Sequence, residues 1–221
     1  MGKTKALCVP MILTSEDKHL SEINYKNNLL QTLVDKPDFV FWNDYFPQNY
    51  IDKLLDIIEQ QETEEALTND SRSASNEIRK SKIKFVIHPS FNDSNLRLIC
   101  LETLFLIQKA NIVYNFDIDF SDHIVQLTKY SEQGSYYDWH KDSNILFRQH
   151  PESLQRKLSC TILLKEAKEG GIFETELGTS GYNHKAGSVI VFPSFLKHMV
   201  TPVIRGERIS IVSWTCGPEW K

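Results

Sequence analysis

The stretch YYDWHKDS at residues 136–143 gathers side chains that can bind a metal ion. His140 and Asp142 are two positions apart, and both would point to the same side of a strand because side chains alternate between its faces. One neutral imidazole and one carboxylate at this spacing can share a metal ion. Asp138 has the same offset on the other side of His140, so the stretch alone leaves the choice of carboxylate open.

His198 provides a second candidate imidazole. It lies in the predicted strand LKHMVTPVI and is the only histidine in a predicted strand after the His-x-Asp pair. Two histidines and one carboxylate form the facial triad of non-haem Fe(II), which leaves coordination positions open. Zinc usually takes a closed or nearly closed tetrahedral set of ligands instead. The residues therefore predict a ferrous centre with His140, His198 and one aspartate as its protein ligands.

Arg208 follows His198 by ten positions, and this even separation allows both side chains to face the interior. A guanidinium inside an apolar shell is costly unless it meets an anion, and its planar fork suits a carboxylate. Arg205 lies in the intervening turn at an odd offset, which favours Arg208 as the clamp. An open metal site beside an internal carboxylate clamp predicts a chelating keto acid as the ligand.

The elements that must position these residues differ between the two halves of the chain. Gly2 alone among the nine glycines precedes residue 134, so the first half favours helices and the second half favours strands joined by tight turns. The spacing of apolar residues predicts one helix over 47–67 and another over 92–111. Asp93 or Ser94 is the expected N-cap of the second helix.

The second half of the chain is typical of successive strands: HIVQLTKYS, KLSCTILLK, GGIFETEL, GSVIVFP, KHMVTPVI and RISIVSWTC. No helical pattern separates these strands, which excludes a parallel βαβ sheet and predicts an antiparallel sandwich or jelly roll. The polar segment 68–84 runs into a further strand, IKFVI. This segment is either a flexible connector or a mobile lid over the site, and the lid is the interpretation that we favour slightly.

The bulk composition limits the function classes. The chain has 221 residues, of which 41% are hydrophobic, so it can bury a substantial core. Its net charge of −4 gives no electrostatic reason to expect a nucleic-acid partner. No apolar run approaches the roughly 20 residues that cross a bilayer, so no membrane partner is expected. Four scattered cysteines without a CxxC pair predict reduced thiols and a cytoplasmic protein.

Several motifs follow one another in a fixed order: YSEQGSYYDWHKDS, RKLSCTILL, EGGIFETEL and KAGSVIVFPSFLKHMVTPVIRGERISIVSW. This order resembles that of the Fe(II)- and 2-oxoglutarate-dependent oxygenases, in their prolyl 4-hydroxylase-like branch, over about residues 36–217. The resemblance implies an α+β, mainly β fold with a double-stranded β-helix (jelly-roll) core over about 121–217. Supporting helices over about 36–115 would complete a domain 36–221, after an N-terminal extension, 1–35.

By position, the resemblance implies three iron ligands: His140, Asp142 and His198. It implies that Arg208 binds the distal carboxylate of 2-oxoglutarate. Tyr130 matches a tyrosine that hydrogen-bonds this co-substrate, and Tyr136 and Tyr137 are alternatives for that role. The choice between the two aspartates beside His140 thus falls on Asp142.

The activity implied by the resemblance is hydroxylation of an unactivated C–H bond, with consumption of O2 and release of succinate and CO2. A prolyl residue of a protein or peptide is the expected substrate, and ascorbate is an optional reductant. A free amino acid or another small metabolite is the alternative substrate. Outside the enzyme class, the alternative is a non-catalytic, cupin-like metal-binding module. A monomer or a homodimer is expected.

Overall fold

The computed structural model describes residues 37–65, 79–87, 93–131, 133–143 and 154–218. The expected N-terminal extension, 1–35, lies outside this part, as does most of the predicted lid, 68–84. The described residues form mostly β-structure, together with the helices α2 (Gln48–Glu59) and α3 (Ser94–Tyr114). Neither of these helices combines the length and the apolar composition needed to cross a membrane.

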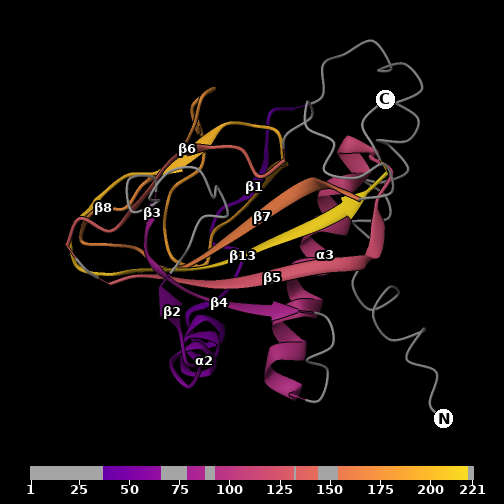
Figure 1. Ribbon diagram of the computed structural model, residues 1–221. Coiled ribbons are helices and arrows are strands. Elements are labelled where there is room, and N and C mark those ends of the chain that lie inside the picture. Colours follow the sequence, from indigo (N-terminus) through magenta and orange to yellow (C-terminus); the bar gives the residue numbers. More distant parts are fainter. Residues whose placement is uncertain (1–36, 66–78, 88–92, 132, 144–153, 219–221) are drawn as a thin grey trace.

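The strands form antiparallel sheets, as predicted. Across the larger, seven-stranded sheet the order is β1 (Val40–Trp42), β10 (Val189–Pro193), β7 (Gln155–Lys165), β13 (Arg208–Gly217), β5 (Asp119–Tyr130), β4 (Lys82–Ile87) and β2 (Glu64–Glu65). The smaller sheet contains β3 (Arg79–Lys80), β6 (Tyr136–His140), β11 (His198–Val200) and β9 (Phe173–Thr175). A separate pair joins β12 (Val203–Arg205) and β8 (Glu169–Gly170). Figure 1 shows β7, β13 and β5 side by side, with α3 crossing them and β6 in another layer.

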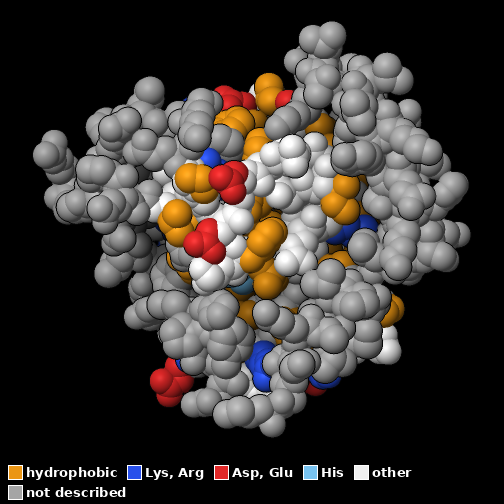
Figure 2. Space-filling model, turned by 90° about the vertical axis from the view of Figure 1, so that its right-hand side faces the viewer, with side chains coloured by type: hydrophobic (Ala, Val, Ile, Leu, Met, Phe, Trp, Pro, Cys, Tyr) orange, Lys and Arg blue, Asp and Glu red, His pale blue; other side chains and the backbone are white. Residues whose placement is uncertain are grey.

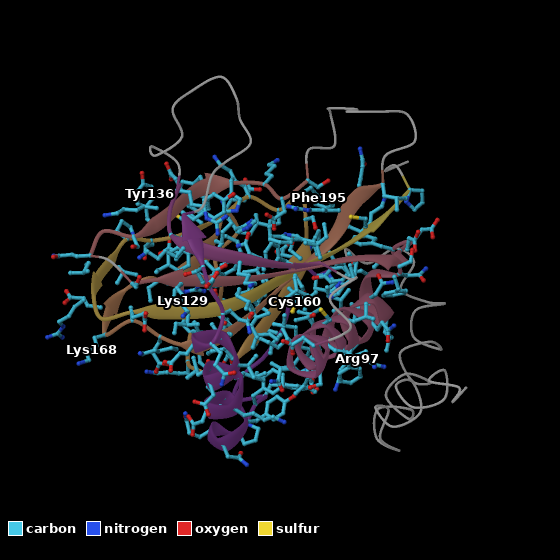
Figure 3. All side chains as sticks on the ribbon, turned by 60° about the horizontal axis from the view of Figure 1, so that its bottom comes forward. Arg97, Lys129, Tyr136, Cys160, Lys168 and Phe195 are labelled. Atoms are coloured by element: carbon cyan, nitrogen blue, oxygen red, sulfur yellow. The ribbon has the colours of Figure 1, made fainter. Side chains whose placement is uncertain are left out.

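The two faces of the large sheet bury different apolar clusters. On β10, Val189 and Val191 belong to the cluster shared with α2 and α3, whereas Ile190 and Phe192 belong to a second cluster with the smaller sheet. This alternation follows from the period-two geometry of a strand that is buried on both faces. Figure 3 shows side chains packed densely around Cys160 on β7, which is fully buried, while Lys168 lies at the edge of the molecule.

The two helices brace the large sheet from one side. Helix α2 buries Ile51, Leu54 and two further isoleucines at helical spacing. Asp93 is the N-cap of helix α3. Its side chain accepts hydrogen bonds from the backbone N–H groups of Asn95 and Leu96. This settles the choice of N-cap in favour of Asp93, because its carboxylate satisfies two N–H groups that have no partner within the helix.

Three predicted elements need correction. The predicted strand GGIFETEL is divided between β8 and β9, which lie in different sheets. The helix predicted over 47–67 ends at Glu59, because the polar run that follows Ile58 offers no apolar side chains at helical spacing to bury. The predicted strand KHMVTPVI is divided into β11 and β12 around Pro202, which has no N–H to donate to a ladder. His198 and Arg208 therefore lie on different sheets, with β12 between them in the chain.

The outer surface is chemically mixed on the side that Figure 2 presents. Among the side chains coloured there, hydrophobic groups lie beside acidic ones, and Lys and Arg form separate spots. The described part of this face has no single dominant charge.

Candidate active site

A group of two histidines and one aspartate forms where β6 and β11 meet. His140 at the end of β6 and His198 at the start of β11 are register partners of the two antiparallel strands. The Oδ1 atom of Asp142 lies 3.7 Å from Nε2 of His140, and its Oδ2 atom lies 3.6 Å from Nε2 of His198. One ligand atom from each residue lies within 4.8 Å of the others, so these three residues could hold a metal ion. We call His140, Asp142 and His198 the metal group.

The proximity of His140 and Asp142 has a different cause from the predicted one. Strand β6 ends at His140, and Asp142 lies in the bend that follows, so the two do not share a strand. The backbone N–H of Ser143 donates to the carbonyl of Ser194 at 2.9 Å, which ties the bend to the chain just after β10. Asp138, the other candidate carboxylate, is exposed, and its Oδ1 atom accepts from the backbone N–H of Trp139.

Both histidine rings are oriented by the backbone. Nδ1 of His140 lies 2.8 Å from the carbonyl oxygen of Asp138, and Nδ1 of His198 lies 2.9 Å from that of Leu196. A carbonyl only accepts hydrogen bonds, so each Nδ1 donates and each Nε2 keeps its lone pair. The two lone pairs are therefore available to a metal ion at the centre of the group.

The carboxylate is fixed by a hydroxyl group. Oγ of Ser159 on β7 donates to Oδ2 of Asp142 at 2.7 Å, and lies 2.9 Å from Oγ of Ser194. Burial by itself would raise the pKa of Asp142, but the positive charges that His198, His140 and Arg156 can carry outweigh it and lower this pKa to about 2. Asp142 is therefore ionised at neutral pH.

His140 is uncharged at neutral pH. Burial, followed by the proximity of His198, lowers the pKa of His140 to about 4. Metal binding requires a deprotonated carboxylate and a neutral imidazole, and Asp142 and His140 are in these states before any metal arrives.

Aromatic side chains pack against the two rings. The ring of Tyr137 stacks on His140 with centroids 3.5 Å apart, and the guanidinium of Arg79 lies 4.5 Å from the other side of the Tyr137 ring. Phe192 meets the ring of His198 edge-on at 4.7 Å. Arg79 is buried and lines the cavity over the metal group. No feature of the sequence distinguishes Arg79 from the other basic residues of IRKSKIK.

Arg208 is a buried cation that faces no acid in the described part of the chain. Its side chain is 2% exposed, its Nη1 donates to Oγ of Ser210 at 2.7 Å, and its Nε has no hydrogen-bond partner. Burial lowers the pKa of Arg208, and the groups that oppose this shift are the phenols of Tyr130 and Tyr182. Since a guanidinium keeps its proton in proteins, an anion is the missing partner.

The three candidate tyrosines are placed differently. Tyr130 is the register partner of Arg208, and the guanidinium lies 5.4 Å from the Tyr130 ring. Tyr137 instead covers His140, while Tyr136 pairs with Lys80 on β3. Of the three, Tyr130 therefore has the position that suits a ligand held by Arg208.

Two further pairs of aromatic and cationic side chains involve residues of β6, β7 and β13. The guanidinium of Arg156 on β7 lies 4.1 Å from the ring of Trp214 on β13, and Trp214 lines the cavity. Trp139 on β6 is 38% exposed, with the amino group of Lys197 at 5.7 Å from its ring.

Comparisons with known proteins agree with the resemblance. Residues 125–216 match the family model of the 2OG-Fe(II) oxygenase superfamily, whose description names both the keto acid and the metal expected here. The chain is 38% identical over 91 residues to a PKHD-type hydroxylase of Alteromonas mediterranea, a match that covers 39% of this chain and 40% of that protein. It is 37% identical over 87 residues to a PKHD-type hydroxylase of Thermosynechococcus vestitus, with 38% of each chain covered. The matches thus span about two fifths of the length of these curated relatives.

Solved structures share the fold over most of the chain. A prolyl-4-hydroxylase of Pseudomonas putida superposes with a TM-score of 0.61 at 19% identity, covering 81% of this chain and 92% of that one. A prolyl hydroxylase of Trichoplax adhaerens, in complex with a hypoxia inducible factor oxygen degradation domain peptide fragment, superposes with a TM-score of 0.65 at 15% identity. That match covers 92% of this chain and 93% of that one. At sequence identities of 19% and 15%, the similarity to these two structures is evidence for a shared fold and for nothing beyond the fold.

Proposed function

We propose that this chain, whose residues 125–216 match the 2OG-Fe(II) oxygenase superfamily, is an Fe(II)- and 2-oxoglutarate-dependent dioxygenase that hydroxylates a prolyl residue of a protein or peptide. The observation that carries the proposal is the juxtaposition of two features in one cavity. A His-Asp-His group with its ligand atoms turned inward lies in the same cavity as Arg208, a buried guanidinium without an acidic partner in the described residues.

His140 and His198 would bind the iron through Nε2, and Asp142 through one carboxylate oxygen. The donor set fits, because two imidazoles and one carboxylate suit non-haem Fe(II) and leave room for other ligands. When bound, iron and 2-oxoglutarate together supply the oxidising chemistry, which consumes O2 and releases succinate and CO2. Ser159 would keep the carboxylate of Asp142 in place, and the two backbone carbonyls would keep the rings in place.

Arg208 would bind the distal carboxylate of the keto acid, and Tyr130 beside it would donate a further hydrogen bond. Ser210 already engages Nη1 of Arg208, which restrains the guanidinium before the ligand enters. A restrained donor loses less entropy on binding, and its charge raises the strength of each hydrogen bond. Arg205, the rival considered from the sequence, is exposed and lies near Glu169, so it has no access to this cavity.

The architecture that we propose is a double-stranded β-helix over about residues 121–217, within a domain 36–221. Support comes from the facing antiparallel sheets, from the cavity between them and from the fold shared with prolyl hydroxylases. Helices α2 and α3 brace the outer face of the large sheet and keep it rigid. A site on rigid strands holds its donor atoms more precisely than a site on loops.

Aromatic and cationic side chains near the cavity suit a peptide substrate. Trp139, which precedes His140 on β6, is exposed, and the guanidinium of Arg156 lies 4.1 Å from the ring of Trp214, which lines the cavity. Flat aromatic faces pack well against a prolyl ring, and a guanidinium donates to peptide carbonyl groups. The Trichoplax adhaerens relative in complex with a peptide fragment supports the same substrate class.

A second candidate substrate is a small metabolite with a carboxylate group. Nη2 of Arg79 is buried and has no hydrogen-bond partner, and Arg79 lines the cavity. A free amino acid could offer its carboxylate to this donor. A non-catalytic metal-binding module would have no use for the buried charge of Arg208.

The test uses the iron-loaded protein in the absence of O2. Addition of 2-oxoglutarate should produce a visible absorption band, and admission of air should then yield succinate. His198→Ala should abolish both signals, whereas the exposed Arg205→Met should preserve both. If the wild-type protein shows neither the band nor succinate, the proposed function is wrong.

The substrate class is tested separately. A peptide array that contains proline, with matched peptides in which alanine replaces it, is incubated with the loaded protein and analysed by mass spectrometry. We expect the mass of one added oxygen atom in prolyl peptides alone. Turnover of free amino acids without turnover of any peptide would favour the small-metabolite candidate.

A further inference from the structure

A second cavity lies next to Arg208, away from the metal group. Its volume is about 280 Å³, and its lining includes Gly171, Ile172, Tyr182 and His184. Arg208 and Phe173 line this cavity as well as the one that contains the metal group. Arg208 therefore lies where the two cavities meet.

Tyr182, which lines the second cavity with Arg208, carries an unsatisfied hydroxyl group. The residue is 5% exposed, and its hydroxyl is buried with no hydrogen-bond partner. A buried polar group without a partner costs stability, so a hydroxyl of this kind beside a cavity is suited to donate to a ligand that enters the cavity. Burial raises the pKa of Tyr182 to about 12, and the phenol therefore keeps its proton and acts as a donor at physiological pH.

The ring of Tyr182 is held in place from two sides. Phe41 on β1 meets it edge-on with centroids 6.4 Å apart, and His184 does so at 4.6 Å. The backbone around it is tied down as well, because the N–H of Asn183 donates to Oδ1 of Asn43 at 3.0 Å. The hydroxyl is thus directed by packing and not by a hydrogen bond of its own.

Tyr182 and Arg208 need the same kind of partner. Nε of Arg208 is a buried donor without a partner, as is the hydroxyl of Tyr182, and both residues line one cavity. In the described part of the chain, the phenols of Tyr130 and Tyr182 and the imidazole of His184 interact electrostatically with Arg208, and no carboxylate does. Two unmet donors beside a buried positive charge make a site for an anion that accepts several hydrogen bonds.

We propose that Tyr182 is a co-substrate-binding residue, whose hydroxyl donates a hydrogen bond to the distal carboxylate of 2-oxoglutarate held by Arg208. This inference rests on the proposed function. The distal carboxylate then receives donors from two separate parts of the chain: Arg208 from β13 and Tyr182 from the segment that precedes β10. One consequence is selectivity for keto acids with a second carboxylate, since a monocarboxylic keto acid leaves both donors unmet.

The test compares Tyr182→Phe with the wild-type protein, in the iron-loaded state without O2. Binding of 2-oxoglutarate is followed by the visible band and by calorimetry, and binding of the monocarboxylic 2-oxobutyrate is measured in the same way. We expect the Kd for 2-oxoglutarate to rise about tenfold or more, the loss typical of a hydrogen bond to a charged group. The Kd for 2-oxobutyrate and the affinity for iron should stay unchanged.

Tyr114→Phe is the matched control, because Tyr114 is also a buried tyrosine but donates to the carbonyl of Val191, from helix α3. It should leave both keto-acid affinities unchanged. If Tyr182→Phe binds 2-oxoglutarate as tightly as the wild type while Arg208→Met binds it weakly, Tyr182 has no role in the clamp and the proposed function stands. If the wild type itself does not bind 2-oxoglutarate, both proposals are wrong.

Discussion

His140 and His198 face each other as register partners on antiparallel strands, with ring centroids 4.2 Å apart. Each ring donates its Nδ1 proton to the carbonyl of the residue two positions earlier. The same local arrangement thus occurs twice, once at the end of β6 and once at the start of β11. Because the acceptors are backbone carbonyl groups, the orientation of both rings is fixed without a metal ion.

Asp142 depends on a side chain for its orientation, and this difference leads to a prediction. Ser159→Ala removes the hydroxyl that donates to Oδ2 of Asp142. We expect the affinity for Fe(II) to fall about 10- to 100-fold, the usual loss when a hydrogen bond to a metal ligand is removed. Anaerobic equilibrium dialysis with Fe(II) measures the effect.

Ser188→Ala is the control for this substitution, since Ser188 is equally buried but donates to Asn183. It should leave the Fe(II) affinity at the wild-type value. Equal affinities for the Ser159 variant and the wild type would mean that the carboxylate needs no support from β7.

The substitution Arg208→Met tests whether Arg208 binds the co-substrate without contributing to metal binding. We expect the affinity for 2-oxoglutarate to fall on the order of 100-fold, because charged hydrogen bonds to a carboxylate are lost. The iron affinity should not change. In the absence of 2-oxoglutarate, the free energy of unfolding should stay equal or rise, since a buried charge without a partner is removed. Chemical denaturation and calorimetry measure the two effects.

Arg205→Met is the matched control, because Arg205 forms an exposed ion pair with Glu169 at 3.9 Å. Such surface pairs contribute little to stability, and this substitution should leave both affinities unchanged. Loss of iron from the Arg208 variant would mean that Arg208 supports the metal ligands and not the keto acid.

The order of strands in the second half of the chain was largely predictable, since apolar residues fill them and glycines separate them. The division of the strand after His198 was harder to predict. It depends on Pro202 and on the pairing of β12 with β8, a contact between segments far apart in sequence. The end of α2 at Glu59 also depends on where tertiary packing stops, because the polar residues that follow have adequate helix propensity.

The approach of His140, Asp142 and His198 to one another could be predicted, because their residue types are chemically specific and two of them are close in sequence. The residues that surround them could not. Ser159, Arg79 and Tyr182 are a serine in an apolar strand, an arginine in a basic run and a tyrosine in a turn-rich segment. The surroundings of these three residues depend on burial and on the side chains that face them in the fold. The local sequence pattern encodes neither of these two features.

Gly170 provides a test of the contact between β8 and β12. Its φ is +73°, and a Cβ atom there would lie 2.1 Å from the carbonyl oxygen of Pro202. Gly170→Ala should therefore lower the free energy of unfolding by about 3 kcal/mol or more, from backbone strain and from the clash together. Gly178 has a φ of +80° but no atom within 4 Å of the same position. Gly178→Ala should cost about 1–2 kcal/mol, and equal losses in chemical denaturation would contradict the clash.

We expect the free energy of unfolding of the metal-free protein to depend on pH because of the lowered pKa of His140. Its pKa is lowered by burial from 6.5 to about 4, so the unfolded state takes up the proton first as the pH falls. The free energy of unfolding should therefore decrease by about 3 kcal/mol between pH 6.5 and pH 4, and then level off with respect to this group. The contribution of Asp142, with its pKa near 2, is lost only at lower pH. His140→Asn should remove this decrease in denaturation measured with a chelator present, and an unchanged slope in that variant would show that His140 titrates normally.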